Sequence, residues 1–168
     1  MYLQELRISN FRCFSEPQTI EFSKGINVLV GENDSGKSAI IDAIRIVMGT
    51  TDQGWYRIEP TDFNAERKDV EIAITLKFSD LSKAEQASFL ECLTCETVGG
   101  KDMPCLYINW KCKYLLSFTP PRTSIRVTTG INGDGPSLSA EARELLRVTY
   151  LRPLTDSYSN MQAGRNSR

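Results

Sequence analysis

One octapeptide constrains the fold of this chain more than any other stretch. Residues 31–38 read Gly-Glu-Asn-Asp-Ser-Gly-Lys-Ser and match the phosphate-binding pattern G-x-x-x-x-G-K-[ST]. A short apolar run precedes the octapeptide at residues 25–30, and apolar residues at helical spacing follow it at residues 39–48. This order predicts a buried parallel strand, a phosphate-binding loop, and a helix that ends at Gly49.

The residue types of the octapeptide suit the phosphates of a nucleotide. Gly31 and Gly36 allow the backbone to turn tightly, so that several N–H groups point inward at an anion. The helix that follows adds its positive N-terminal end. Lys37 supplies a mobile positive charge for the β- and γ-phosphates, and the hydroxyl of Ser38 suits Mg²⁺. The loop therefore predicts nucleotide binding, with Mg²⁺ as the accompanying ion.

The composition is that of an ordinary globular domain. The chain has 168 residues, 40% of them hydrophobic, with a net charge of −1. It has no apolar run near the roughly 18 residues of a membrane helix and no signal-peptide pattern at its N-terminus. We therefore expect a cytoplasmic protein without a membrane partner. The net charge gives no overall basic signature for nucleic acid, but it is compatible with a local basic surface.

The five cysteines and the lack of histidine limit the metal and redox chemistry. An odd cysteine count without a signal peptide argues against a disulfide framework. Zinc would need a set such as Cys92, Cys95, Cys105 and Cys112, but the second pair is spaced as in a strand and not as in a zinc knuckle. We favour ordinary thiols over a zinc site. Without histidine, no histidine-based triad or metal site is available within these residues.

The rest of the chain alternates between strand and helix patterns. Strands are expected at about 2–9, 18–22, 69–78, 124–129 and 148–151, and residues 105–116 are expected to form one or two strands. Helices are expected from a capping box at Ser82 to about residue 93, and over residues 139–147. Residues 49–68 are expected to form a loop that packs through Trp55, Tyr56 and Phe63. The turn at residues 10–14 places Arg12 near the phosphate-binding loop. Two alternatives remain open for its side chain, namely a contact with a phosphate or the ribose, or exposure to solvent.

A phosphate-loop ATPase usually also needs an apolar strand that ends in an acidic residue, which holds Mg²⁺ and orients the attacking water. Asp80 follows an alternating strand with Ser79 between them, and Asp156 follows a broken segment. Neither acid fits this pattern. The sequence therefore predicts a chain that binds a nucleotide but does not hydrolyse it efficiently by itself.

The order of these features resembles a known family of ATPases. A strand, then Asn10-Phe11-Arg12, then a second strand and the octapeptide is similar to the start of an ABC-type ATPase head of the RecF-like and SMC-like branch. Residues 138–154 and 164–168 are in addition similar to the OLD (overcoming lysogenization defect) family of ATP-dependent endonucleases. The middle of the chain, residues 80–130, resembles this family only loosely.

The resemblance implies an α/β fold, namely part of an ABC-type P-loop ATPase head with a mixed sheet, an antiparallel β portion and flanking helices. Its parts would be a Walker A lobe at 1–50, an antiparallel β and helix lobe at about 69–130, and a returning helix and strand at about 139–154. Lys37 would be the catalytic residue, Ser38 would ligate Mg²⁺, and Arg12 would lie near the nucleotide. The residues implied in ATP binding are Gly31, Asn33, Asp34, Ser35, Gly36, Lys37, Ser38 and Ala39.

OLD proteins combine this ATPase with a Toprim metal-dependent nuclease, and several act against bacteriophage. The resemblance thus implies the front part of a longer DNA endonuclease that acts as a homodimer of full-length subunits and contacts DNA through its other parts. Two alternatives stay open from the sequence. One is a RecF-like or SMC-like ATPase of DNA repair or chromosome handling, and the other is a nucleotide-binding regulatory module without turnover.

Overall fold

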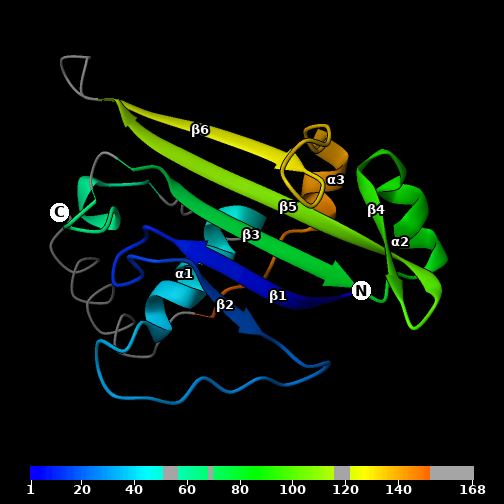
Figure 1. Cartoon of the computed structure of the whole chain (residues 1–168), viewed down its shortest axis with the longest axis horizontal. Coiled ribbons are helices and arrows are strands. Elements are labelled where there is room, and N and C mark those ends of the chain that lie inside the picture. Colours follow the sequence, from blue (N-terminus) through cyan, green and yellow to red (C-terminus); the bar gives the residue numbers. More distant parts are fainter. Residues whose placement is uncertain (51–56, 68–69, 116–121, 152–168) are drawn as a thin grey trace, which may run out of the picture.

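The computed structural model describes residues 1–50, 57–67, 70–115 and 122–151. Its centre is one six-stranded sheet in which β2, β1, β3, β5 and β4 lie side by side and β6 pairs with β5 (Figure 1). Every strand pair in this sheet is antiparallel. The strands are β1 (Tyr2–Ser9), β2 (Gln18–Glu21), β3 (Ile72–Ser79), β4 (Leu93–Val98), β5 (Lys101–Leu115) and β6 (Arg122–Thr129). The helices are α1 (Lys37–Met48), α2 (Lys83–Ser88) and α3 (Ala140–Leu145), with short 3₁₀ turns at Pro60–Asp62 and Leu90–Cys92.

Alternation along the central strands decides which face of the sheet is buried. In β3 the residues Ile72, Ile74, Leu76 and Phe78 are all buried, while the residues between them are partly exposed. Successive side chains of a strand point to opposite faces, so these four residues form one apolar surface. They belong to the same core as the α1 residues Ala39, Ile40 and Ala43. The helix that follows the phosphate loop is thereby fixed against the sheet.

The α/β fold class and the antiparallel portion of the sheet are confirmed. The predicted capping box also forms, since the Ser82 hydroxyl accepts a hydrogen bond from the Glu85 N–H and the Glu85 carboxylate accepts one from the Ser82 N–H. Gly99 and Gly100 both have positive φ angles and join β4 to β5 in a two-residue hairpin. Within the described residues, no helix is long and apolar enough to cross a membrane.

Three predicted elements differ from the structure. Residues 25–30 form no strand: Ile26, Val28 and Val30 are 93%, 76% and 89% exposed. A strand needs a hydrogen-bonded neighbour, and the sheet of the described residues ends at β2 on this side. The predicted strand at 148–151 is reduced to one parallel bridge between Val148 and Thr50. The helix predicted to reach residue 93 ends at Ser88, because a 3₁₀ turn and β4 follow it.

Glu85 also anchors the start of the chain, which gives a pH-dependent stability. Its carboxylate oxygens lie 2.8 and 3.0 Å from the Met1 ammonium. Hydrogen bonds from this ammonium and from the Ser82 N–H lower the pKa of Glu85 from 4.5 to about 2. Because the folded-state pKa is depressed, the stabilisation is fully present above pH 4.5 and is lost as the pH falls towards 2.

We therefore expect Glu85→Gln to lower the urea midpoint at neutral pH and to have progressively less effect as the pH falls through this window. The measurement is a series of urea unfolding curves, with Glu91→Gln as the control because Glu91 is an exposed glutamate of the neighbouring 3₁₀ turn. A constant difference between Glu85→Gln and wild type at every pH would contradict the assignment.

Candidate nucleotide site

The phosphate loop folds around the Lys37 ammonium. Lys37 Nζ donates hydrogen bonds to the carbonyl oxygen of Gly31 at 2.9 Å and to Ser35 Oγ at 3.2 Å, and it also bonds the Glu32 carbonyl. Gly36 forms the N-cap of α1 with a φ angle of 92°. The loop residues 31–35 are exposed. This arrangement leaves the loop backbone and the first turn of α1 open to an anion.

The turn after β1 supports the loop from the protein side. A β-carbon placed on Gly36 would lie 2.9 Å from both Cys13 Sγ and the Phe14 ring. Phe11 is fully buried, and its backbone is bonded in both directions to that of Phe14. Glycine is therefore required at position 36 for two reasons, the positive φ angle and the absence of space for a side chain.

Arg12 lies between two carboxylates. Its Nε is 2.9 Å from Asp62 Oδ1, and its Nη1 is 2.7 Å from Asp42 Oδ2 on α1. Asp42 in turn bonds Arg45 at 2.9 Å, and the Arg45 guanidinium lies 3.6 Å from the centre of the Tyr150 ring. A chain of charged contacts thus links the turn after β1, the middle of α1 and the segment after α3.

The backbone of this turn is strained at Arg12. Arg12 has a φ angle of 49°, and Asn10 and Asp34 have angles of 55° and 65°. Asparagine and aspartate tolerate the left-handed region, but arginine has no such preference. Strain of this kind costs about 1–3 kcal/mol and clusters at functional sites. The Arg12 N–H donates a hydrogen bond to the Asp62 carbonyl, and the Arg12 carbonyl accepts one from the Asn64 side-chain amide.

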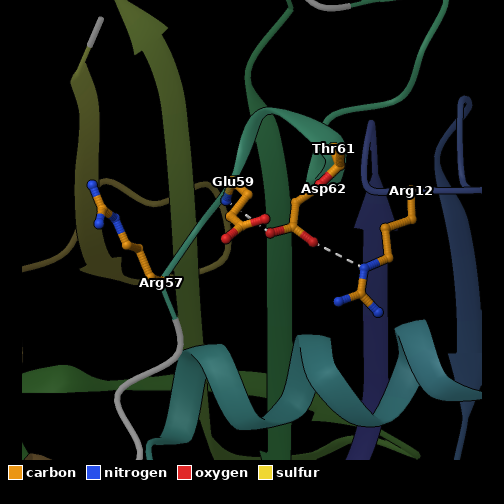
Figure 2. Close-up of a pocket in the computed structure, with 5 residues that line it drawn as sticks. All are labelled: Arg12, Arg57, Glu59, Thr61 and Asp62. Atoms are coloured by element: carbon orange, nitrogen blue, oxygen red, sulfur yellow. Dashed lines mark hydrogen bonds and ion pairs between the residues drawn. The ribbon is translucent and has the colours of Figure 1, made fainter. Parts of the chain in front are cut away.

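An open pocket of about 410 Å³ adjoins this turn (Figure 2). In the figure, the Asp62 carboxylate points towards Arg12, and Arg57 lies on the far side of Glu59. The pocket is lined by Arg12, Arg57, Glu59, Thr61 and Asp62. It therefore offers both charged groups and a hydroxyl beside Arg12.

The structure brings most of the predicted site residues together. The residues of the octapeptide form one loop at the start of α1, and Arg12 reaches this helix through Asp42. Ala39 is only 4% exposed, and its side chain belongs to the core. Asp80, in contrast, follows the end of β3 that pairs with Tyr2, and it pairs with Lys24. This end of the sheet is opposite to the end that carries the turn after β1.

Sequence analysis missed the carboxylates that hold Arg12. Asp42 lies within the helix predicted at residues 39–48, and Asp62 lies within the loop predicted at residues 49–68; neither was predicted to contact Arg12. The sequence did contain a signal for Asp62. Glu59 and Asp62 cap a 3₁₀ turn reciprocally, and Pro60 occupies the first position of this turn. This combination is typical of the start of a helix. Trp55, Tyr56, Asp156 and residues 164–168, which also entered the predictions, lie outside the described residues.

Comparisons with known proteins identify the family of this chain. An AAA domain family model matches residues 5–150 of the chain. The chromosome partition protein Smc of Mycobacterium leprae is 39% identical over 85 residues, which are 51% of this chain and 7% of that protein. Smc of Lactiplantibacillus plantarum is 30% identical over 150 residues, which are 85% of this chain and 12% of that protein. This chain therefore spans only about a tenth of the length of these relatives.

A solved structure has the same fold. It is described as "Structural biochemistry of ATP-driven dimerization and DNA stimulated activation of SMC ATPases", and it aligns with a TM-score of 0.51 at 21% sequence identity. The alignment covers 87% of this chain and 75% of that one. The family model spans most of the chain, and both sequence relatives described above are Smc proteins. The chain belongs to the AAA domain family and is similar to part of the SMC proteins in sequence and in fold.

Proposed function

We propose that this chain binds ATP with Mg²⁺ as part of an SMC-like or RecF-like ATPase. The observation that carries the proposal is the position of the Lys37 ammonium, which lies over the loop backbone at the start of α1. Lys37 contacts the β- and γ-phosphates, and the Ser38 hydroxyl is a Mg²⁺ ligand. The backbone N–H groups that bind the phosphates belong to Gly31, Asn33, Asp34, Ser35, Gly36 and Ala39.

Arg12 takes part in this site through its guanidinium. Its Nη1 pairs with Asp42 and its Nε with Asp62 in the structure. A guanidinium has five N–H donors, so a contact with a phosphate or the ribose either shares the guanidinium with these carboxylates or displaces one of them. The adjoining pocket gives the nucleotide room beside Arg12. Binding of ATP then alters the charged contacts of α1 as well as those of the loop.

Hydrolysis needs further groups. Among the described residues, the strand β3 is followed by Asp80, but this acid pairs with Lys24 and lies at the wrong end of the sheet. We expect this chain alone to bind ATP in isothermal titration calorimetry and to show at most trace ATPase activity in a phosphate-release assay. Absence of ATP binding would refute the proposed function, and robust multiple turnover would show that a catalytic carboxylate lies within these residues.

Cys13 provides a reporter of nucleotide binding. Cys13 is exposed and borders the loop at Gly36, whereas Cys95 is exposed on β4. Cys92, Cys105 and Cys112 are buried. Burial raises the pKa of Cys105 and that of Cys112 to about 11, so these two remain unreactive thiols at neutral pH.

We expect ATP with Mg²⁺ to slow alkylation of Cys13 by iodoacetamide and to leave alkylation of Cys95 unchanged, because only the first thiol adjoins the phosphates. Peptide mass spectrometry over a time course measures both rates in one sample. Equal protection of the two cysteines would indicate a general effect of nucleotide on the fold, and no protection of Cys13 would contradict the placement of the phosphates.

In the whole protein, we propose that residues 25–30 become a strand. Ile26, Val28 and Val30 are β-branched and almost fully exposed, although this composition favours a pleated, buried environment. A neighbouring strand supplied by the rest of an SMC-like protein would cover them. Full-length subunits are then expected to form homodimers and to contact DNA, as the description of the solved SMC structure suggests.

The OLD-type endonuclease remains a narrower candidate. It is favoured by the sequence of residues 138–154 and 164–168, of which the structure describes only the part up to residue 151. A Toprim nuclease predicts Mg²⁺-dependent cleavage of plasmid DNA by the full-length protein. An SMC-like protein predicts long heptad repeats instead. Nuclease assays and the sequence beyond residue 168 distinguish these two classes.

A further inference from the structure

We propose that the outer face of the β5–β6 strand pair contacts the phosphate backbone of DNA. This inference rests on the proposed function, which expects DNA as a partner, and it names the surface that binds the DNA. We call this surface the basic face. It comprises Lys111 and Lys113 on β5 and Arg122 and Arg126 on β6. No residue of the basic face belongs to the nucleotide site, so the two surfaces are tested separately.

Strand register places these four side chains on one side of the sheet. Trp110 and Cys112 are 3% and 0% exposed and point to the core, so Lys111 and Lys113 point outward by alternation. Arg126 is paired directly with Lys111, and Arg122 is paired with Leu115, which is outward by the same alternation. Directly paired residues share a face, so both arginines are outward as well.

The repulsion between these positive charges destabilises the folded chain, and an anionic ligand would relieve it. Lys111 and Arg126 face each other across the strand pair, and like charges in that relation are destabilising. Glu71 offsets part of the charge, since its carboxylate lies 3.3 Å from Lys111 Nζ and 3.6 Å from Lys113 Nζ. Both lysines nevertheless remain exposed, at 47% and 66%. In a chain with a net charge of −1, the basic face is a marked local excess of positive charge.

The strand pair also has a shape that gives access to a large ligand. β3 pairs with β5 only as far as Cys112, whereas β5 and β6 continue together to Leu115 and Arg122. The two strands therefore run past the end of β3 as a ribbon (Figure 1). Lys113 and Arg122 lie on this extension, and Lys111 and Arg126 lie at its base.

The chemistry of the basic face favours nucleic acid over a protein partner. The centre of a protein interface is depleted in charge and enriched in aromatic residues. The outward residues of β6 are instead the two arginines together with Ser124 and Thr128. Lysine, arginine and hydroxyl side chains are the groups that bind phosphate oxygens in protein–DNA complexes. Contacts of this kind carry no sequence preference, so we expect binding to duplex DNA of any sequence.

The test compares two double variants with the same change in charge. Lys113→Gln with Arg126→Gln removes two cations from the basic face and keeps the ion pair of Lys111 with Glu71. The control, Lys83→Gln with Lys101→Gln, removes two exposed cations from α2 and from the opposite end of β5. Fluorescence anisotropy with a labelled random-sequence duplex measures affinity between about 50 and 200 mM salt, the range over which counterion release dominates.

We expect the first variant to weaken binding and to reduce the slope of log affinity against log salt by about 1.8, since each neutralised phosphate contributes about 0.9. The control should keep the wild-type slope. Equal slopes for the two variants, no binding of the wild type, or equally tight binding of a polyglutamate peptide would each overturn the proposal. Calorimetric ATP affinity of both variants is measured in parallel and should equal that of the wild type, so failure of ATP binding is seen independently of DNA binding.

Discussion

Lys37→Ala is expected to reduce ATP affinity by about a hundredfold or more, because charge-assisted hydrogen bonds contribute about 1.5–3 kcal/mol each and about 1.4 kcal/mol is a factor of ten. In the structure, Lys37 Nζ bonds only exposed groups of the loop, among them the Gly31 carbonyl and the Ser35 hydroxyl. Water can replace the ammonium at these groups. We therefore expect the unfolding midpoint of the variant to stay close to that of the wild type.

Calorimetry measures the affinity, and thermal unfolding without nucleotide measures the stability. Lys101→Ala is the matched control, since Lys101 is an exposed lysine at the hairpin of β4 and β5. Unchanged ATP affinity in Lys37→Ala would exclude the octapeptide as the phosphate site. A large loss of stability would show instead that Lys37 shapes the loop, and Lys37→Met would then separate packing of its stem from its charge.

Gly36→Ala is expected to damage both the fold and the site. Its φ angle is 92°, and the new methyl group would lie 2.9 Å from Cys13 Sγ and from Phe14. A β-carbon in the left-handed region costs about 1–2 kcal/mol, and overpacking costs about 1–3 kcal/mol more. We therefore expect a loss of about 2–5 kcal/mol in the free energy of unfolding, together with a large loss of ATP affinity.

Gly49→Ala separates these two costs. Gly49 also has a positive φ angle, 74°, but nothing lies within 4 Å of the added methyl group. Its ψ angle of 166° puts it in an extended region of positive φ that is essentially confined to glycine, so it should show a conformational cost alone, about 1–3 kcal/mol. It should keep ATP affinity because it lies at the other end of α1. Urea unfolding measures both variants, and a loss in Gly36→Ala no larger than the left-handed cost of about 1–2 kcal/mol would show that the turn after β1 does not support the loop in solution.

The sequence allowed the local elements to be predicted well where the residues themselves encode them. The octapeptide and the capping box at Ser82 both specify backbone geometry through a few residues, and the structure contains the helix and the cap they predict. The alternation of β3 likewise specifies its buried face. Such features depend on neighbours in the chain, so they can be recognised without knowledge of the fold.

Features that depend on distant partners were harder to predict. Residues 25–30 have the composition of a strand, but pairing decides whether a strand forms, and the described residues supply no neighbour. The contacts of Arg12 with Asp42 and Asp62 join parts of the chain that are 30 and 50 residues apart. Neither acid belongs to a sequence motif that predicts an ion pair with an arginine. Long-range ion pairs of this kind become visible only once the sheet brings the segments together.

The pairing of β1 with β3 has a consequence for how folding and nucleotide binding are coupled. Ile8 pairs with Ile74 and Leu6 with Leu76. The phosphate loop and α1 therefore lie in the long segment that connects β1 to β3. Closing a loop costs conformational entropy, and the turn that supports Gly36 is held by Asp62 and Asn64, which lie within the same part of the chain. ATP should therefore bind the folded chain and not the unfolded one. Its concentration then sets the apparent melting temperature, with a gain of about 2.7 kcal/mol at a hundred times the dissociation constant.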